Sequence, residues 1–241
     1  MGFLDGPHGI VATYLRFLML VMTSAHDEFM SEDFALLSVK RITVLGILCT
    51  VYPVLLVWNY TGMFLDDIFF PRWREVRIET PLFIVGNARS GTTLMHRMMA
   101  LNEQNFTFFR TWEILVGVSV TWRLLFLFLA WLDTWVGSPC ALALDVLERA
   151  TVRSIKVHAI GLQLPEEDEW LMIWICKAQL LMMPFPLAGP LLGDLVLFDT
   201  HVPPDTRSSI MSFYRDCVQR HMYARSLWRH QDAADFSFLS K

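Results

Sequence analysis

The sequence of 241 residues lacks an excess of positive charge. Its formal net charge is −4, and no stretch combines a run of basic residues with aromatic residues that could stack on bases. Proteins that bind nucleic acids usually show both features. Nucleic acid is therefore excluded as an expected partner.

The sequence also has few cysteines, and they are far apart: Cys49, Cys140, Cys176 and Cys217. No two of them form a C-x-x-C pair, and no histidine pair stands beside them at the spacing of metal ligands. We therefore expect no metal site. The connectivity of any disulfide stays open, and each cysteine is interpreted as a small buried hydrophobic residue.

Apolar residues, by contrast, are plentiful. They make up 54% of the chain, above the roughly 45–50% of typical soluble domains. This excess indicates contact with a membrane or with an unusually apolar partner. The length is sufficient for one sizeable domain with a hydrophobic core.

Two apolar stretches lie near the N-terminus. The stretch Ile10–Met22 is interrupted by Arg16 and is too short to span a bilayer, so we expect a surface or packed helix. The stretch Ile42–Trp58 has no charge and lies between basic and aromatic flanks. It predicts a single-pass membrane anchor, kinked near Pro53, with a buried core helix as the alternative.

Residues 1–60 are therefore interpreted as a membrane-associated anchor and residues 61–241 as one domain. The sequons at Asn59 and Asn105 favour a lumenal position for that domain, although the basic residues on both sides of the anchor leave its orientation open. The segment Ile114–Val136 is also very apolar. Because Arg123 lies in its middle, we expect a buried or membrane-facing helical hairpin there and no second span.

The most informative stretch is Pro81–Ala100. Leu82–Val85 is a short apolar run that predicts a buried strand, and Thr93–Ala100 is rich in helix formers. The loop between them, Gly86–Thr93, has the spacing of a phosphate-binding loop. Thr92 replaces the lysine that binds nucleotide triphosphates, and the positive charge is supplied by Arg89, whose planar fork suits two oxygens of a phosphate or sulfate group.

At these residues the chain resembles the sulfotransferases that use 3'-phosphoadenosine 5'-phosphosulfate (PAPS), and the carbohydrate and tyrosylprotein branch in particular. The resemblance is carried by an apolar strand followed by Arg89-Ser90-Gly91-Thr92-Thr93-Leu94 and a helix. It implies an α/β fold with a P-loop-like parallel sheet flanked by helices. It also implies sulfuryl transfer from PAPS to a hydroxyl or amine. The donor-binding residues would be Asn87, Ala88, Arg89, Ser90, Gly91, Thr92 and Thr93.

The resemblance also suggests catalytic residues. Arg89 would hold the sulfate, Glu113 would act as the general base, and Lys241 would neutralise the bridging oxygen of the donor. No metal is needed in this scheme. The stretch Pro165–Leu171 predicts the start of a helix, and the resemblance makes Glu167, Glu169 and His158 second-rank candidates for acceptor contact.

Near the end of the sequence, Pro203-Pro204-Asp205 and the apolar spacing that follows predict a helix from about Thr206 to Trp228. Basic residues gather towards the end of this helix, where we expect a solvated face that complements the helix dipole. They are Arg220, His221, Arg225, Arg229 and His230.

The sequence stops at Lys241, where the family continues with a strand and helix that bind the 3'-phosphate. We therefore expect the C-terminal portion of the domain to be missing and the chain to transfer sulfate poorly. The alternatives are an inactive, truncated membrane-bound relative and a P-loop nucleotide kinase or hydrolase, which Thr92 disfavours. The expected acceptor is a small-molecule, carbohydrate or lipid-like compound, and the expected location is a Golgi-type membrane.

Overall fold

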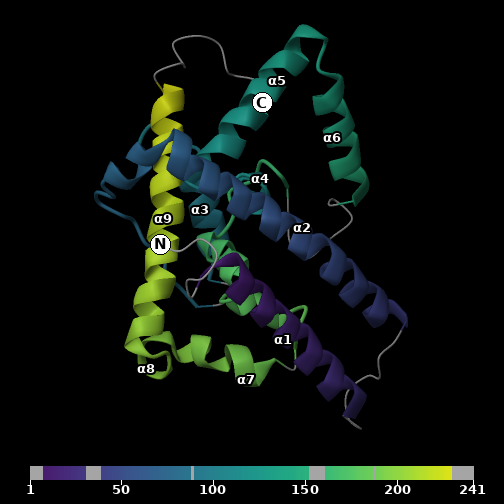
Figure 1. Ribbon diagram of the computed structural model, residues 1–241. Coiled ribbons are helices and arrows are strands. Elements are labelled where there is room, and N and C mark those ends of the chain that lie inside the picture. The colour runs from purple at the N-terminus through teal and green to yellow at the C-terminus, as the bar shows by residue number, and fades with distance from the viewer. Residues whose placement is uncertain (1–7, 31–38, 88–89, 152–160, 187, 230–241) are drawn as a thin grey trace. The chain divides into compact units, whose positions relative to one another are not determined.

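The computed structural model describes residues 8–30, 39–87, 90–151, 161–186 and 188–229. Figure 1 shows that this part of the chain is built from helices joined by loops. It is 73% helical and contains no strand or sheet, apart from one isolated bridge between Arg110 and Pro165. The predicted α/β fold with a P-loop-like parallel sheet is therefore wrong for the described part of the chain.

The correction centres on the run Leu82–Val85, which was expected to form a buried strand. The backbone of residues 81–87 has no regular structure. Leu82, Phe83 and Val85 are 57%, 73% and 89% exposed. A strand exists only when a neighbouring strand accepts and donates its backbone hydrogen bonds. An apolar run indicates a local preference for extended backbone. It does not show that another strand lies beside it to form the hydrogen bonds, and none does here among the described residues.

The chain divides into two compact units, and we describe each one separately. The first consists of Met1–Phe64 and Asp168–Cys217, and the second of Leu65–Glu167 and Val218–Lys241. Two long helices, α2 (Val39–Phe69) and α9 (Pro204–Arg229), contribute to both. Helix α2 passes through Thr61, the predicted start of the domain, without a break.

The first unit contains α1 (Ile10–Met30), most of α2 and a series of short helices. These are η2 (Asp168–Ile175), η3 (Gln179–Met182), α7 (Gly189–Leu192), η4 (Gly193–Leu197) and α8 (Phe198–His201). Proline and glycine residues break the apolar sequence of residues 184–193, which explains why the helices there are short. The start of α9 completes the unit.

Aromatic rings form the core of this unit. Phe17 stacks on Tyr52 with ring centroids 4.3 Å apart, and Tyr52 stacks on Trp174 at 5.9 Å. The hydroxyl of Tyr60 donates to the carbonyl oxygen of His8 at 2.7 Å and lies 3.2 Å from that of Trp174. Each tyrosine thus buries its ring while its polar tip keeps a partner, as a dry core requires.

The second unit contains the end of α2, η1 (Pro71–Glu75), α3 (Thr92–Ala100), α4 (Thr111–Leu115), α5 (Val120–Trp135), α6 (Pro139–Thr151) and the end of α9. Its centre is Asp66, which is fully buried. The Asp66 carboxylate accepts from the backbone N–H groups of Val120 and Thr121 at 2.9 and 2.8 Å, and so caps α5. Arg220 Nε lies 3.2 Å from the same carboxylate, and the guanidinium covers the ring of Trp73 at 3.7 Å.

Within the described residues, one helix is long and apolar enough to cross a membrane: Arg41–Phe69, which is nearly all of α2. One face of α2 is buried through Leu45, Tyr52 and Leu56. The opposite face exposes an apolar stripe made of Val44, Ile47, Val51, Val54 and Val57. An apolar stripe left outside the protein core suits contact with lipid, so the predicted single-pass anchor agrees with this helix.

The helices predicted at Ile10–Met22 and near residues 206–228 are confirmed as α1 and α9, and α1 continues to Met30. The prediction that every cysteine is buried is wrong for two of them. All four are free thiols, but only Cys176 and Cys217 are buried, whereas Cys49 and Cys140 are exposed.

Candidate functional site

The loop that leads into α3 is described except at residues 88 and 89. Among its described residues, Ser90 N donates to the carbonyl oxygen of Asn87 at 3.1 Å, which closes a turn. Ala88 and Arg89, two of the predicted donor-binding residues, lie outside the described residues. Asn87, Ser90, Gly91, Thr92 and Thr93 are brought together by the turn and by the first turn of α3.

Two glycines make this turn possible. A Cβ atom on Gly86 would lie 2.5 Å from Ser90 Oγ and 2.8 Å from Thr92 Cγ2, so the backbone at Gly86 and these side chains can approach only without it. Gly91 has φ +89°, in the left-handed region that other residues rarely adopt. The conserved spacing of the two glycines in a phosphate-binding loop thus has a steric cause in this chain.

Gly91 is also the N-cap of α3, and no side chain caps the helix. The first helical bond runs from Met95 N to the Gly91 carbonyl oxygen at 3.0 Å. The N–H groups of the first helical turn have no partner within the helix, and no acidic residue stands in that turn. Together with the hydroxyls of Thr92 and Thr93, these groups form a donor-rich helix end that attracts an anion.

Glu113, the predicted base, lies at the start of α4. Its Oε2 accepts from Arg110 N at 2.8 Å, as part of a capping box that closes this helix end. Its Oε1 lies 3.8 Å from Arg225 Nη2 and 3.9 Å from Arg123 Nη1. Glu113 is only 4% exposed. These contacts give the carboxylate a structural role, and its role as base stays a prediction.

His221 on α9 is a functional candidate that sequence reasoning missed. Its Nδ1 accepts from Arg123 Nη1, and its Nε2 lies 2.8 Å from Thr107 Oγ1 and so donates to that hydroxyl. Its ring lies 4.2 Å from that of Phe109. Burial and the neighbouring Arg123 lower the pKa of His221 well below its usual value, so the ring is neutral.

The basic residues at the end of α9 were expected to form a solvated face, and this prediction is wrong for Arg220 and His221, which are buried. A signal for this was present in the sequence. Ile210, Phe213 and Cys217 form the buried stripe of α9, and the same helical spacing continues that stripe through His221.

The second-rank candidates are dispersed. Glu169 Oε1 accepts from the backbone N–H groups of Gln179 and Leu180 at 2.5 and 3.3 Å, so it caps η3 in the first unit. Glu167 is exposed. The helix predicted from Pro165 is present as the 3-10 helix η2, which begins at Asp168. His158 and Lys241 lie outside the described residues.

Among the described residues, no group of three or more histidine, cysteine or acidic side chains could hold a metal ion. The polar groups of the second unit that could bind a ligand or take part in a reaction therefore lie in two places. One is the donor-rich loop before α3, and the other is the buried cluster of Glu113, Arg123, His221 and Arg225. The ring of His96 on α3 lies 6.4 Å from that of Phe108 and packs α3 against the segment that leads to this cluster.

No family model matches this sequence, and neither the curated proteins nor the solved structures include a match.

Proposed function

We propose that this protein is a membrane-attached sulfotransferase that binds the 5'-phosphosulfate end of PAPS with residues 86–93 and the first turn of α3. The observation that carries the proposal is the beginning of α3, which has Gly91 as its N-cap and no side-chain cap and which lies within the sequence Arg89-Ser90-Gly91-Thr92-Thr93. The proposal depends on this loop alone and needs no sheet.

The residues present fit a phosphosulfate group. The backbone N–H groups of Thr92 and Thr93 and the hydroxyls of Ser90, Thr92 and Thr93 can donate to several oxygens at once, which suits a tetrahedral anion. Arg89 adds the positive charge that the loop otherwise lacks. PAPS, when bound, supplies an activated sulfuryl group whose bridging oxygen leaves with the nucleotide. Donors fixed in the loop stabilise the negative charge that develops on that leaving phosphate.

The same donors would serve a triphosphate poorly. A nucleotide triphosphatase uses a lysine at the position of Thr92 to reach the terminal phosphates and needs a bound magnesium ion. Thr92 offers a short, neutral hydroxyl. The loop therefore favours a group with fewer negative charges than the end of a triphosphate.

A lumenal, Golgi-type location of the second unit is part of the proposal, with a carbohydrate, lipid-like or other small-molecule acceptor. Of the two sequons, Asn59 is fully buried in α2, whereas Asn105 is exposed in a loop. Only Asn105 is thus accessible to a glycosylating enzyme in the folded protein. A glycan that is lost in an Asn105→Gln variant would support this location, and an unmodified Asn105 would contradict it.

Donor binding can be tested without knowing the acceptor. Calorimetry on the full chain in detergent would measure binding of 3'-phosphoadenosine 5'-phosphate, the product that retains the nucleotide part of PAPS. An Arg89→Ala substitution removes charge-assisted hydrogen bonds worth about 1.5–3 kcal/mol. We expect the dissociation constant to rise by roughly tenfold to more than a hundredfold.

An Arg77→Ala variant is the matched control, because it removes the same charge from an exposed position outside the loop. Its affinity should stay close to that of the unmodified chain. Equal affinities of the Arg89→Ala variant and the unmodified chain would refute the proposal. Measured transfer of radiolabelled sulfate to an acceptor would then establish the reaction itself.

A further inference from the structure

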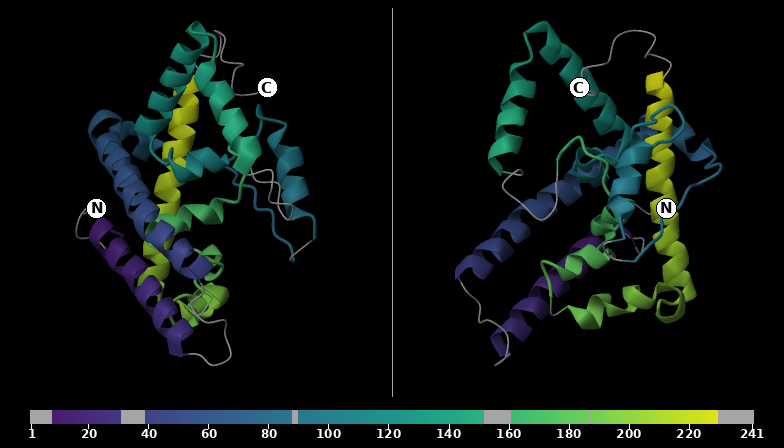
Figure 2. Two further views of the ribbon diagram at one scale, coloured as in Figure 1. Left: turned by 90° about the vertical axis from the view of Figure 1, so that its right-hand side faces the viewer. Right: turned by 180° about the vertical axis from the view of Figure 1, so that it is seen from behind.

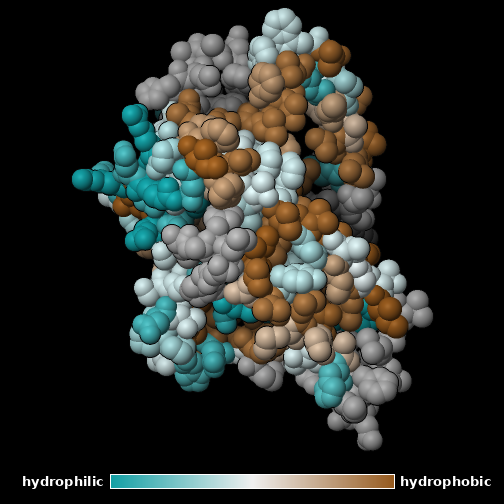
Figure 3. Space-filling view, viewed as in Figure 1, coloured by the Kyte–Doolittle hydropathy of each residue, from teal (hydrophilic) through white to brown (hydrophobic). Residues whose placement is uncertain are grey.

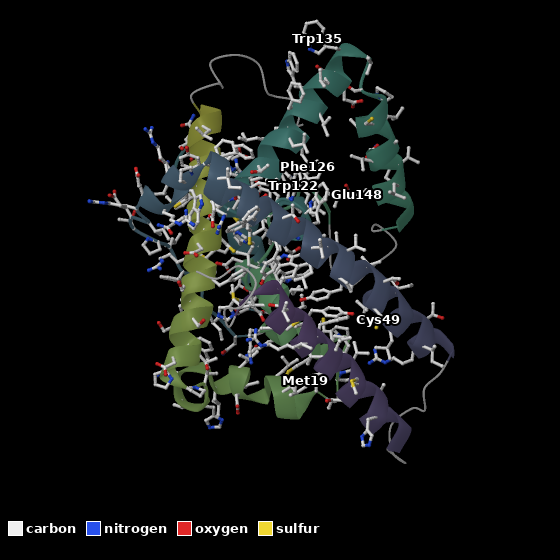
Figure 4. All side chains as sticks on the ribbon, viewed as in Figure 1. Met19, Cys49, Trp122, Phe126, Trp135 and Glu148 are labelled. Atoms are coloured by element: carbon white, nitrogen blue, oxygen red, sulfur yellow. The ribbon has the colours of Figure 1, made fainter. Side chains whose placement is uncertain are left out.

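The α5–α6 hairpin carries a large apolar surface that the proposed function does not use. In Figure 3 hydrophobic side chains cover the part of the surface formed by these two helices. Trp135 lies at the bend between them (Figure 4) and is 75% exposed. The other exposed apolar residues of the hairpin are Leu125, Phe128, Leu129, Trp131, Leu132, Val136, Leu142, Leu144, Val146 and Leu147.

This surface is almost free of charge. From Leu124 to Leu144 the only charged residue is Asp133. Its carboxylate is buried and accepts from the backbone N–H groups of Cys140 and Ala141 at 2.9 and 3.0 Å. Arg123, which seemed from the sequence to lie in the middle of the apolar segment, is buried in the first turn of α5, and its Nε donates to the Gly117 carbonyl oxygen.

The bend between the helices also satisfies its own backbone N–H groups. Ser138 N donates to the Asp133 carbonyl oxygen at 2.8 Å, and Gly137 N donates to that of Thr134 at 3.3 Å. Thr134 Oγ1 donates to the Trp131 carbonyl oxygen at 2.6 Å. Gly137, at φ +88°, permits this tight turn. The turn therefore exposes few polar groups that need water.

We propose that the α5–α6 hairpin inserts its tip, residues 131–142, into one leaflet of a lipid bilayer. A membrane interior tolerates an irregular turn better when its backbone groups and any charge are satisfied internally. At this tip the N–H groups of the bend and the Asp133 carboxylate are satisfied in this way. A protein partner could bond to the Asp133 carboxylate with donors of its own. A lipid chain cannot, and in this tip the carboxylate is already bonded to the backbone N–H groups at the start of α6.

The dimensions favour one leaflet. The 16 residues of α5 would be about 24 Å long at 1.5 Å per residue, which is less than the roughly 30 Å of a hydrocarbon core. The chain bends by 111° between the two helices, and Figure 2 shows from two sides that α6 turns back from the end of α5. A hairpin of this size can enter a bilayer and return without crossing it.

The test places a fluorescent probe at the tip of the full chain in lipid vesicles. Val136→Cys is introduced together with Cys49→Ser and Cys140→Ser, since the two remaining cysteines are buried, and the new thiol is labelled with an environment-sensitive dye. We expect a blue-shifted emission that is quenched by lipids carrying a doxyl group on the acyl chain. Quenching should be stronger for a deep doxyl position than for a shallow one.

A Glu79→Cys variant in the same background is the control, because residue 79 is exposed and polar and lies in the same unit. Its dye should keep a water-like emission and resist quenching, even if α2 anchors the protein. A water-like emission at residue 136 would overturn the proposal. A blue-shifted but unquenched probe would also overturn it, since a second copy of the chain or another protein would then cover the tip.

Discussion

The α-helices that begin in the second unit differ in how their first N–H groups are bonded. Asp66 caps α5, Glu113 caps α4 and Asp133 caps α6, each through hydrogen bonds from backbone N–H groups. Helix α3 begins at Gly91 with no side-chain cap. The carboxylates are thus bonded to the fold itself, and the helix end without one is left able to bind an external anion.

Removal of Asp66 should have the largest effect. An Asp66→Ala substitution leaves Arg220 buried beside Trp73 without its carboxylate and leaves two N–H groups of α5 without an acceptor. Breaking a buried ion pair in this way typically costs about 3–5 kcal/mol. Chemical denaturation in detergent should show that loss in the free energy of unfolding.

The neighbouring Asp67 provides the comparison, because its side chain is 30% exposed whereas that of Asp66 is fully buried. It pairs with Arg74 and Arg220 and accepts from Trp73 Nε1 at 3.2 Å. An Asp67→Ala variant should lose less than the Asp66→Ala variant, about 1–2 kcal/mol. If both variants lose the same amount, Asp66 has no special role as the cap of α5.

Substitution of Glu113 tests whether this residue only caps α4 or also acts as the catalytic base. Glu113→Gln retains an oxygen that can accept from Arg110 N, but it removes the charge beside Arg123 and Arg225. We expect a loss of about 1–3 kcal/mol in the free energy of unfolding, typical of hydrogen bonds to charged groups. Affinity for 3'-phosphoadenosine 5'-phosphate should not change.

Measured sulfate transfer tests whether Glu113 is the general base. If the folded Glu113→Gln protein binds nucleotide and no longer transfers sulfate, Glu113 is the base. If transfer falls only in proportion to the folded fraction, Glu113 is a structural residue alone and the base must be sought elsewhere.

The smallest expected effect is on the pH dependence of stability. Burial lowers the pKa of His221 well below 6.5, so at mildly acidic pH the unfolded chain binds a proton that the folded chain does not. The contribution of this histidine to the free energy of unfolding is therefore fully present above about pH 7. It falls as the pH drops below 6.5, and the loss is about 1 kcal/mol at pH 6. Thermal unfolding at several pH values would measure the decrease.

His8 contributes in the same direction, because burial lowers its pKa to about 4. A His221→Gln variant should therefore show a shallower pH dependence that does not vanish. An unchanged slope in that variant would mean that His221 is not neutral in the folded protein.

Much of the local structure could be read from the sequence. Apolar spacing predicted α1, α2 and α9, and the glycines at 86 and 91 predicted the turn before α3. These predictions succeeded because backbone sterics and helical periodicity act within a few residues. The strand predicted at Leu82–Val85 does not form, and the burial of His221 was not predicted. A partner strand and a buried environment both come from residues far away in the chain.

The amino-acid sequence by itself thus determined where helices form, where the chain turns and which segment is apolar enough to span a membrane. Only the tertiary structure decided how the charges are used. It placed Glu113 among Arg123, His221 and Arg225 and joined Asp66 to Arg220, which lie far apart in the sequence. The physical reason is that hydrogen bonds and desolvation depend on distances of a few ångströms, and those distances exist only once the chain has folded.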